Sequence, residues 1–258
     1  MINLKNCCQF YKNYFFATLF LLIISCSNQK NYVSKIEGKK IAITDKQIQD
    51  NEIDNFIKPY REKIDKDMSE VLAYNPEILD KNGQWQSNIG VLQADISMTY
   101  ANKVFQKRYQ KSIDILLLNH GGIRSILPKG NLTIRNAYQI APFENYLFVV
   151  KLKGHQILEL CNYFINEKKP HPLAGLTFTI DIDKKPINIL IQKQALDLEK
   201  VYDVATSDYL SNGGDNMNFF KINQGKIDLD YKIRNIFIDY LKDIDTVSID
   251  KSIRINSL

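Results

Sequence analysis

The stretch Ile113-Asp114-Ile115-Leu116-Leu117-Leu118-Asn119-His120-Gly121-Gly122-Ile123-Arg124 decides the fold. Its first half is an apolar run that stops at a glycine turn, as expected of a strand covered on both faces. The paired glycines allow a tight turn and close approach by a ligand. Arg124 then lies near the strand end, where open α/β sheets place their ligands. The stretch predicts an α/β protein with a binding site at this edge.

Helices and strands are expected to alternate on both sides of this stretch. Periodicity and turn residues predict helices over residues 50–72, 88–105, 133–138, 154–166 and 229–241. They predict strands over residues 39–44, 113–118, 146–152, 176–182, 186–192, 201–206 and 252–255. This order, with short gaps late in the chain, predicts an α/β fold in which helices flank a mixed β-sheet in a single domain.

The N-terminal residues have the pattern of a targeting segment. Lys5 and Lys12 precede an apolar stretch of about eleven residues, too short for a bilayer span of roughly 20. Leu22-Ile23-Ile24-Ser25-Cys26 resembles a bacterial lipobox. We therefore expect a lipoprotein signal peptide over 1–25, a lipidated tether over 26–34 that begins at Cys26, and a folded domain over 35–258. An uncleaved anchor helix or a plain signal peptide is the alternative.

This organisation determines the predicted location and the expected state of the cysteines. A lipid on Cys26 would anchor the chain in the cell envelope, on the periplasmic side. Cys7 and Cys8 would leave with the signal, so Cys161 could form no internal disulfide. Cys161 lies in an apolar helical stretch and is expected to be a buried, inert thiol. Loss of the signal with Lys5 and Lys12 would lower the formal net charge from +5 to +3, a mild excess that suits an anionic small molecule or a membrane surface and does not indicate nucleic-acid binding.

Two further segments carry side chains suited to a nucleotide. Phe143 follows Pro142, and Tyr209 opens the run Tyr209-Leu210-Ser211-Asn212-Gly213-Gly214-Asp215. Two rings that converge on one slot can stack on a base, which contributes roughly 1–3 kcal/mol per ring. The Arg124 guanidinium matches phosphate oxygens, and the Asp215 carboxylate can accept from ribose hydroxyls. Each residue alone also has an ordinary interpretation, as a core ring, a solvated arginine or a sharp turn.

The order of these motifs carries a resemblance. Asn119-x-Gly-Gly-Ile-Arg124, Pro142-Phe143, Leu152-Lys153-Gly154 and Tyr209-Leu-x-Asn-Gly-Gly-Asp215 resemble, in this order, the C-terminal domain of the 5′-nucleotidase/UDP-sugar hydrolase family. The core motifs run over residues 87–220. In that family, the C-terminal domain holds the nucleotide while an N-terminal metallophosphatase domain hydrolyses it.

The resemblance also implies roles for single residues. It implies that Phe143 and Tyr209 sandwich the base, and that Gly175 lines the base pocket with its backbone. It further implies that Asn119 contacts the nucleoside, Arg124 the phosphate and Asp215 the ribose. Stacking involves only the flat faces of a base, so these residues do not predict which base is preferred.

Two departures from the family pattern limit what the chain can do. Relatives often carry a second phosphate-binding arginine shortly before the segment that matches Ser87, whereas residues 82–86 hold no basic residue. Phosphate affinity would then be weaker, or completed by another chain. The metal-binding motifs Asp-x-His, Gly-Asn-His and Gly-His-x-His do not occur around the three histidines His120, His155 and His171. We expect His155 and His171 at the surface, while His120 could contact a ligand.

The leading hypothesis is therefore the nucleotide-binding half of a split periplasmic 5′-nucleotidase. A separate metallophosphatase chain, which carries the divalent metals, would cleave the phosphoester. No catalytic residue, metal ligand or cofactor is expected in this chain. The helix over 50–72 is expected to expose an apolar patch towards the partner. A stand-alone nucleoside- or nucleotide-binding lipoprotein is the alternative, and a degenerate interaction scaffold is a third possibility.

Overall fold

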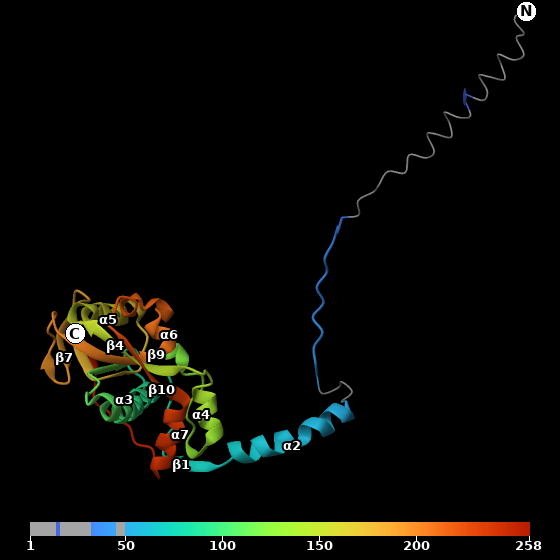
Figure 1. Ribbon diagram of the computed structural model, residues 1–258, viewed down its shortest axis with the longest axis horizontal. Helices are drawn as coiled ribbons and strands as arrows, with labels where there is room; N and C mark the ends of the chain where they lie inside the picture. Colours follow the sequence, from blue (N-terminus) through green and yellow to red (C-terminus); the bar gives the residue numbers. More distant parts are fainter. Residues whose placement is uncertain (1–13, 16–31, 45–49) are drawn as a thin grey trace, which may run out of the picture. The chain divides into compact units, whose positions relative to one another are not determined.

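The computed structural model describes residues 14–15, 32–44 and 50–258 (Figure 1). Contacts divide the chain into residues 1–51 and residues 52–258, and the fold below is that of the second unit. Cys26 and most of the predicted signal peptide lie outside the described residues. Residues 32–44 are exposed and form no regular element, so the strand predicted over 39–44 is wrong. Within the described parts of the chain, no helix is long and apolar enough to cross a bilayer.

A five-stranded mixed sheet lies at the centre of residues 52–258. Its strand order is β10 (Lys226–Lys232), β4 (Tyr146–Lys153), β9 (Val201–Ser207), β2 (Ile115–Leu117) and β5 (Leu173–Ala174). β2 runs parallel to β9, whereas the other neighbours are antiparallel. The predicted mixed sheet is therefore confirmed.

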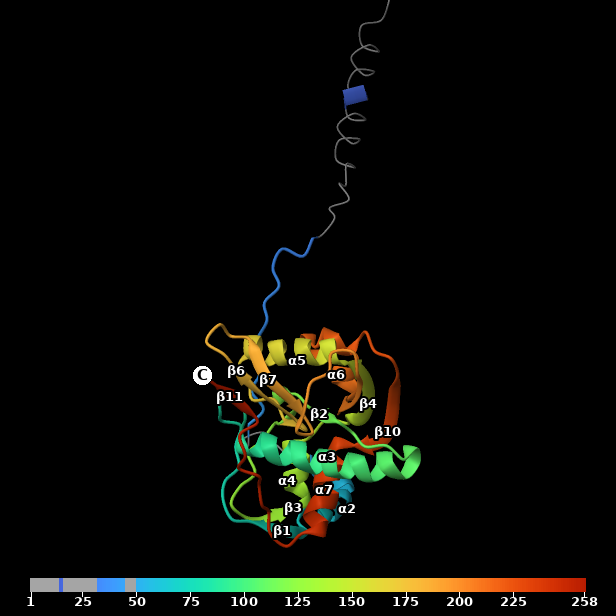
Figure 2. The same cartoon turned by 90° about the vertical axis from the view of Figure 1, so that its left-hand side faces the viewer.

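Both faces of this sheet are buried. Along β2, Leu116 packs in one apolar cluster, whereas Ile115 and Leu117 pack in the other. Successive side chains of a strand point to opposite faces, so this alternation requires a covering layer on each side. Figure 2 shows α3 on one side of the sheet and α5 on the other. The covering helices are α3 (Asn88–Tyr109), α4 (Ile134–Ile140) and α7 (Ile233–Asp243) on the first face and α5 (Gly154–Glu167) on the second.

Two smaller sheets complete the fold. One contains β11 (Ile255–Ser257), β6 (Leu176–Ile180), β7 (Pro186–Ile191) and β8 (Gln194–Ala195), and the other pairs β1 (Val71–Asn75) with β3 (Gly130–Thr133). The strands β6, β7 and β11 lie close to predicted ones, whereas the short strands β1, β3, β5 and β8 were not anticipated. A two- to five-residue strand is too short to establish a period of its own.

One predicted helix is partly wrong. Residues 229–241 were expected to form a single helix, but residues 226–232 are the edge strand β10 and α7 follows at Ile233. Ile227, Leu229 and Tyr231 alternate with polar residues, which is the strand period. The helical pattern begins only after them.

The helix expected over 50–72 is α2 (Asn51–Met68), and none of its residues is buried. Phe56, Tyr60 and Ile64 remain 71%, 63% and 55% exposed. The expected exposed apolar patch is therefore present. Near the C-terminal end of α2, Asp65 accepts a hydrogen bond from Arg135 Nη2 at 2.8 Å.

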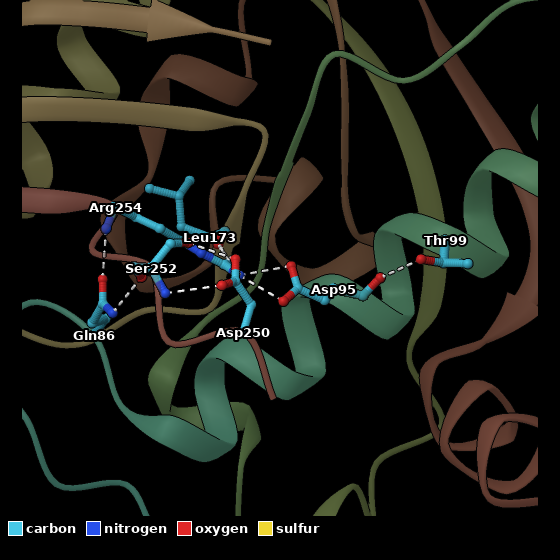
Figure 3. A network of polar contacts seen from close by, with 7 residues as sticks. All are labelled: Gln86, Asp95, Thr99, Leu173, Asp250, Ser252 and Arg254. Carbon is cyan, nitrogen blue, oxygen red and sulfur yellow. Dashed lines mark hydrogen bonds and ion pairs between the residues drawn. The ribbon is translucent and has the colours of Figure 1, made fainter. Parts of the chain in front are cut away.

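The last strand is tied to α3 by a buried arginine (Figure 3). The Arg254 guanidinium donates to both carboxylate oxygens of Asp95, at 2.7 and 2.6 Å, and to the backbone oxygen of Leu173. The Arg254 backbone N–H donates to Gln86 Oε1 at 2.8 Å. Both bonds to the Asp95 carboxylate come from Nη2, and such charge-assisted hydrogen bonds are among the stronger polar contacts, so they fix α3 relative to the strand that precedes Gly175.

Candidate functional site

The site begins where β2 ends. Asn119 leads into the single turn η1 (His120–Gly122), in which Gly122 N donates to Asn119 O at 3.0 Å. A Cβ on Gly122 would lie 2.9 Å from Asn119 Oδ1, so a larger residue here would have to displace the Asn119 side chain. Arg124 N then donates to Ile140 O at 2.9 Å, which brings the end of α4 beside the turn.

A second turn comes from the segment after β9. Ser207 caps α6 (Asp208–Ser211) by accepting from Leu210 N at 3.1 Å. A Cβ on Gly214 would come within 2.5 Å of the Tyr209 ring, so glycine lets the backbone lie against that ring. Tyr209 Oη donates to Asp215 Oδ1 at 2.8 Å and accepts from Asp215 N at 3.1 Å. The turn therefore locks ring and carboxylate together.

Asp215 joins the two turns. Its second carboxylate oxygen accepts from Asn119 Nδ2 at 2.8 Å, across 96 residues of sequence. Its backbone oxygen accepts from Tyr163 Oη, also at 2.8 Å. Tyr209 and Asn119 thus hold the carboxylate and Tyr163 holds the backbone of Asp215, and a carboxylate has enough lone pairs to accept further hydrogen bonds.

These turns enclose a pocket of about 310 Å³. Its lining residues are Asn119, Gly121, Gly122, Arg124, Phe143, Asn145, Tyr209 and Asp215. Phe143 and Tyr209 are 48% and 46% exposed, so neither ring is a core residue. The volume lies at the lower end of the range of small-molecule sites. Five of the six residues expected in a nucleotide site are brought together here.

Positive charge gathers on one side of the pocket. The Arg124 guanidinium lies 5.8 Å from the centroid of the Phe143 ring, and Nη1 donates to Gly121 O at 3.4 Å. Burial, and then the nearby charge of Arg124, lower the pKa of Lys81. The segment 82–86 holds no arginine, but the lysine just before it lies within the electrostatic range of Arg124. This side suits an anionic group.

His171 is buried, so the expectation of a surface position is wrong. Its side chain is 3% exposed and packs edge-on to Phe164, with 5.4 Å between the ring centroids. Leu118 N donates to Pro172 O, which places the segment of His171 against the end of β2. His171 Nδ1 accepts from His120 N at 3.2 Å and so supports the glycine turn. The surface position was predicted because His171 lies between two prolines, but prolines restrict the backbone and do not indicate whether a residue is buried.

Ionisation supports this arrangement. Burial lowers the pKa of His171 to about 4, with a further contribution from His120. The ring is therefore neutral at neutral pH and keeps a lone pair for the His120 N–H. Burial, followed by the charge of Lys81, also lowers the pKa of His120. His155 is exposed, as expected.

Two other predicted residues lie outside this pocket lining. Gly175, between β5 and β6, has φ 78°, and a Cβ there would lie 2.2 Å from Asp114 O. This gives Gly175 a structural reason to be glycine. Cys161 is fully buried, as expected, and burial raises the pKa of its thiol to about 12. Among the residues that the structure describes, no three histidine, cysteine or acidic side chains gather in a group that could hold a metal ion.

Comparisons with known proteins agree with this geometry. Residues 69–222 match the family described as 5′-nucleotidase, C-terminal domain. The chain is 22% identical over 224 residues to a 5′-nucleotidase of Vibrio parahaemolyticus. The aligned region covers 83% of this chain and 38% of that protein. It is 26% identical over 209 residues to a trifunctional nucleotide phosphoesterase protein of Bacillus subtilis, covering 74% of this chain and 14% of that protein.

Solved structures give the same result. A 5′-nucleotidase precursor from Thermus thermophilus superposes with a TM-score of 0.66 at 26% identity, covering 79% of this chain and 42% of that one. The NAD nucleotidase of Haemophilus influenzae superposes with a TM-score of 0.56 at 19% identity, covering 81% and 42%, and shares the fold. The chain thus spans less than half the length of each of these proteins.

Proposed function

Because the chain belongs to the family of 5′-nucleotidase C-terminal domains, we propose that it is the nucleotide-binding half of a split 5′-nucleotidase. A separate metallophosphatase chain, which carries the divalent metals, hydrolyses the phosphoester. The observation that carries this proposal is the convergence of Asn119, Arg124, Phe143, Tyr209 and Asp215 on one pocket of about 310 Å³.

The pocket provides a contact for each part of a nucleotide. The base stacks between Phe143 and Tyr209, which together bring roughly 2–6 kcal/mol at 1–3 kcal/mol per ring. The Asp215 carboxylate, already oriented by Tyr209 and Asn119, accepts from the ribose hydroxyls. Arg124 donates to the phosphate, and Lys81 adds positive charge on the same side.

The partner contacts the apolar face of α2. Phe56, Tyr60 and Ile64 recur at helical spacing on this face and are exposed, and a contiguous apolar surface of this kind is typical of an interaction site. Acylation of Cys26 holds the pair at the membrane, on the periplasmic side of the cell envelope. Nucleotide catabolism is the process that this assembly serves.

Reconstitution tests the split arrangement. The full chain is purified together with any metallophosphatase that associates with it, and phosphate release from AMP is measured for each chain and for the mixture. We expect release at a high rate only from the mixture. Release by this chain alone would refute the split. Nucleotide binding with no hydrolysis in any mixture would favour the stand-alone binding lipoprotein.

Two substitutions test the pocket itself by titration calorimetry. Phe143→Ala should weaken AMP binding by about 1–3 kcal/mol without changing the unfolding midpoint. Arg124→Ala should weaken AMP binding much more than adenosine binding, because only AMP carries the phosphate. Tyr109→Ala, at a half-exposed ring outside the pocket lining, is the matched control and should change neither affinity. Equal losses of AMP and adenosine in Arg124→Ala would refute the phosphate role.

A further inference from the structure

The turn that carries Asp215 has an unfavourable backbone conformation. Asp215 has φ 51° and ψ 29°, and the next residue, Asn216, has φ 61°. Both residues lie in the left-handed region, where the Cβ of an ordinary residue comes too close to a backbone oxygen. Such a conformation costs free energy and persists only where surrounding contacts hold it. The contacts around Asp215 therefore determine the direction of its carboxylate.

Tyr163 of α5 makes one of these contacts from outside the pocket lining. Its Oη donates to the backbone oxygen of Asp215 at 2.8 Å. Tyr209, by contrast, lines the pocket and bonds to the carboxylate and to the backbone N–H of Asp215. A ligand in the pocket can contact Tyr209 directly, whereas the Tyr163 hydroxyl can affect it only through Asp215.

Aromatic neighbours hold the Tyr163 ring in place. The ring packs edge-on to Phe219, with 5.9 Å between the ring centroids and 71° between the planes. It also lies 5.6 Å from the centroid of the His171 ring, which accepts a hydrogen bond from His120 N in the first turn. Burial raises the pKa of the Tyr163 hydroxyl, so this group keeps its proton and remains a donor. Tyr163 is therefore a fixed donor that connects α5 to the turn of Asp215.

We propose that Tyr163 is a positioning residue of the nucleotide pocket: its hydroxyl holds the Asp215 backbone in the left-handed conformation that directs the carboxylate to the ribose hydroxyls. This inference rests on the proposed function, which places a nucleotide in the pocket. If Asp215 left this conformation, its Cα–Cβ bond would change direction and its carboxylate would move away from Asn119 Nδ2, now 2.8 Å away. Loss of the Tyr163 hydroxyl should therefore weaken recognition of the ribose and leave stacking on the base unchanged.

Two nucleotides that differ only in the ribose isolate this contact in the full chain. AMP carries both ribose hydroxyls, whereas 2′,3′-dideoxy-AMP carries neither and has the same base and phosphate. By calorimetry, we expect the wild-type chain to bind AMP about tenfold more tightly, because hydrogen bonds to a charged group contribute more than neutral ones. Tyr163→Phe keeps the ring and removes only the hydroxyl. This variant should lower the preference to about threefold without changing the affinity for the dideoxy nucleotide.

A double-mutant cycle tests whether the hydroxyl acts through Asp215. Asp215→Ala should abolish the preference, so that both nucleotides bind equally. Tyr163→Phe added to this variant should then change neither affinity, because the carboxylate that it positions is gone. A further loss of AMP affinity in the double variant would overturn the inference.

Tyr202→Phe is the matched control. Tyr202 is 2% exposed and lies outside the pocket lining, and its Oη accepts from Asp197 N at 2.9 Å. This variant should unfold at lower denaturant concentration but keep the full preference for AMP. Three results would overturn the inference and leave nucleotide binding intact: a wild type without the preference, Tyr163→Phe with the full preference, or Tyr163→Phe with equal losses for both nucleotides. A wild-type chain that binds neither nucleotide would overturn the proposed function as well.

Discussion

The helices α2 and α7 have the same kind of sequence but opposite surroundings. Each places apolar residues on one face and charged residues on the other. α7 buries Ile233, Ile236, Phe237 and Leu241 against the central sheet and α3, whereas α2 buries nothing. An amphipathic sequence therefore specifies which face of a helix is apolar, but it does not specify what packs against that face. α7 packs on its own chain, whereas no described residue buries the apolar face of α2.

Among the substitutions that test this comparison, the largest change in stability is expected in the packed helix α7. Phe237 is 1% exposed, and its truncation leaves a cavity beneath the sheet. Phe237→Ala should therefore lower the free energy of unfolding by about 3–5 kcal/mol. Urea denaturation followed by circular dichroism measures this loss. A loss below about 1 kcal/mol would mean that α7 is as loosely held as α2.

The second effect is a pH dependence of protein stability, which is expected because His171 is buried in the packed domain. The pKa of His171 is about 4 in the folded protein and near 6.5 when unfolded, so below pH 6.5 the unfolded state binds more protons. Stability should therefore fall as the pH drops from 6.5 to 4, by up to about 3 kcal/mol. His171→Asn keeps an acceptor for His120 N but cannot titrate.

Denaturation of the wild type and of His171→Asn at pH 7 and pH 4.5 isolates this contribution. The two proteins should differ in how much stability they lose between these pH values. If both proteins lose the same stability, protonation of His171 on unfolding is not the cause of the pH dependence.

A third, smaller effect concerns the contact that joins α2 to the domain. Arg135 and Asp65 form an ion pair at 2.8 Å with both side chains about half exposed. Exposed pairs of this kind contribute roughly 0–1 kcal/mol. Arg135→Ala should speed hydrogen exchange in the last turn of α2 and change global unfolding by less than 1 kcal/mol. High salt should mimic the substitution in the wild type, because salt screens exposed charges.

The smallest effect on stability is expected on the exposed face. Phe56→Ser should change the free energy of unfolding by less than about 0.5 kcal/mol, because the ring is already in solvent. The same substitution should reduce recovery of the metallophosphatase partner in co-purification. A marked loss of stability would show instead that α2 packs on its own chain.

The same contrast explains what the sequence could predict. The run 113–118, the mixed sheet and the helix that contains Cys161 were predictable because local periodicity and burial agree there. The start of β10 was missed because its alternation merges into the helical pattern of α7. β5 has only two residues and exists through pairing with β2, a contact that local sequence does not encode.

The site shows the same division. Asn119, Arg124, Phe143, Tyr209 and Asp215 were predictable because each belongs to a motif with its own turn. His171 was not, because burial of a polar residue depends on the elements that pack around it.

The Arg254 contact has a consequence for the synthesis of the chain. Its partner Asp95 lies 159 residues earlier, in the helix that covers one face of the central sheet. During synthesis, α3 is therefore made long before Arg254, and the Asp95–Arg254 ion pair can form only when almost the entire domain has been synthesised. Such long-range closure slows folding and leaves incomplete chains with exposed apolar surface. Premature termination anywhere before residue 254 should yield a product that chaperones and proteases recognise as unfinished.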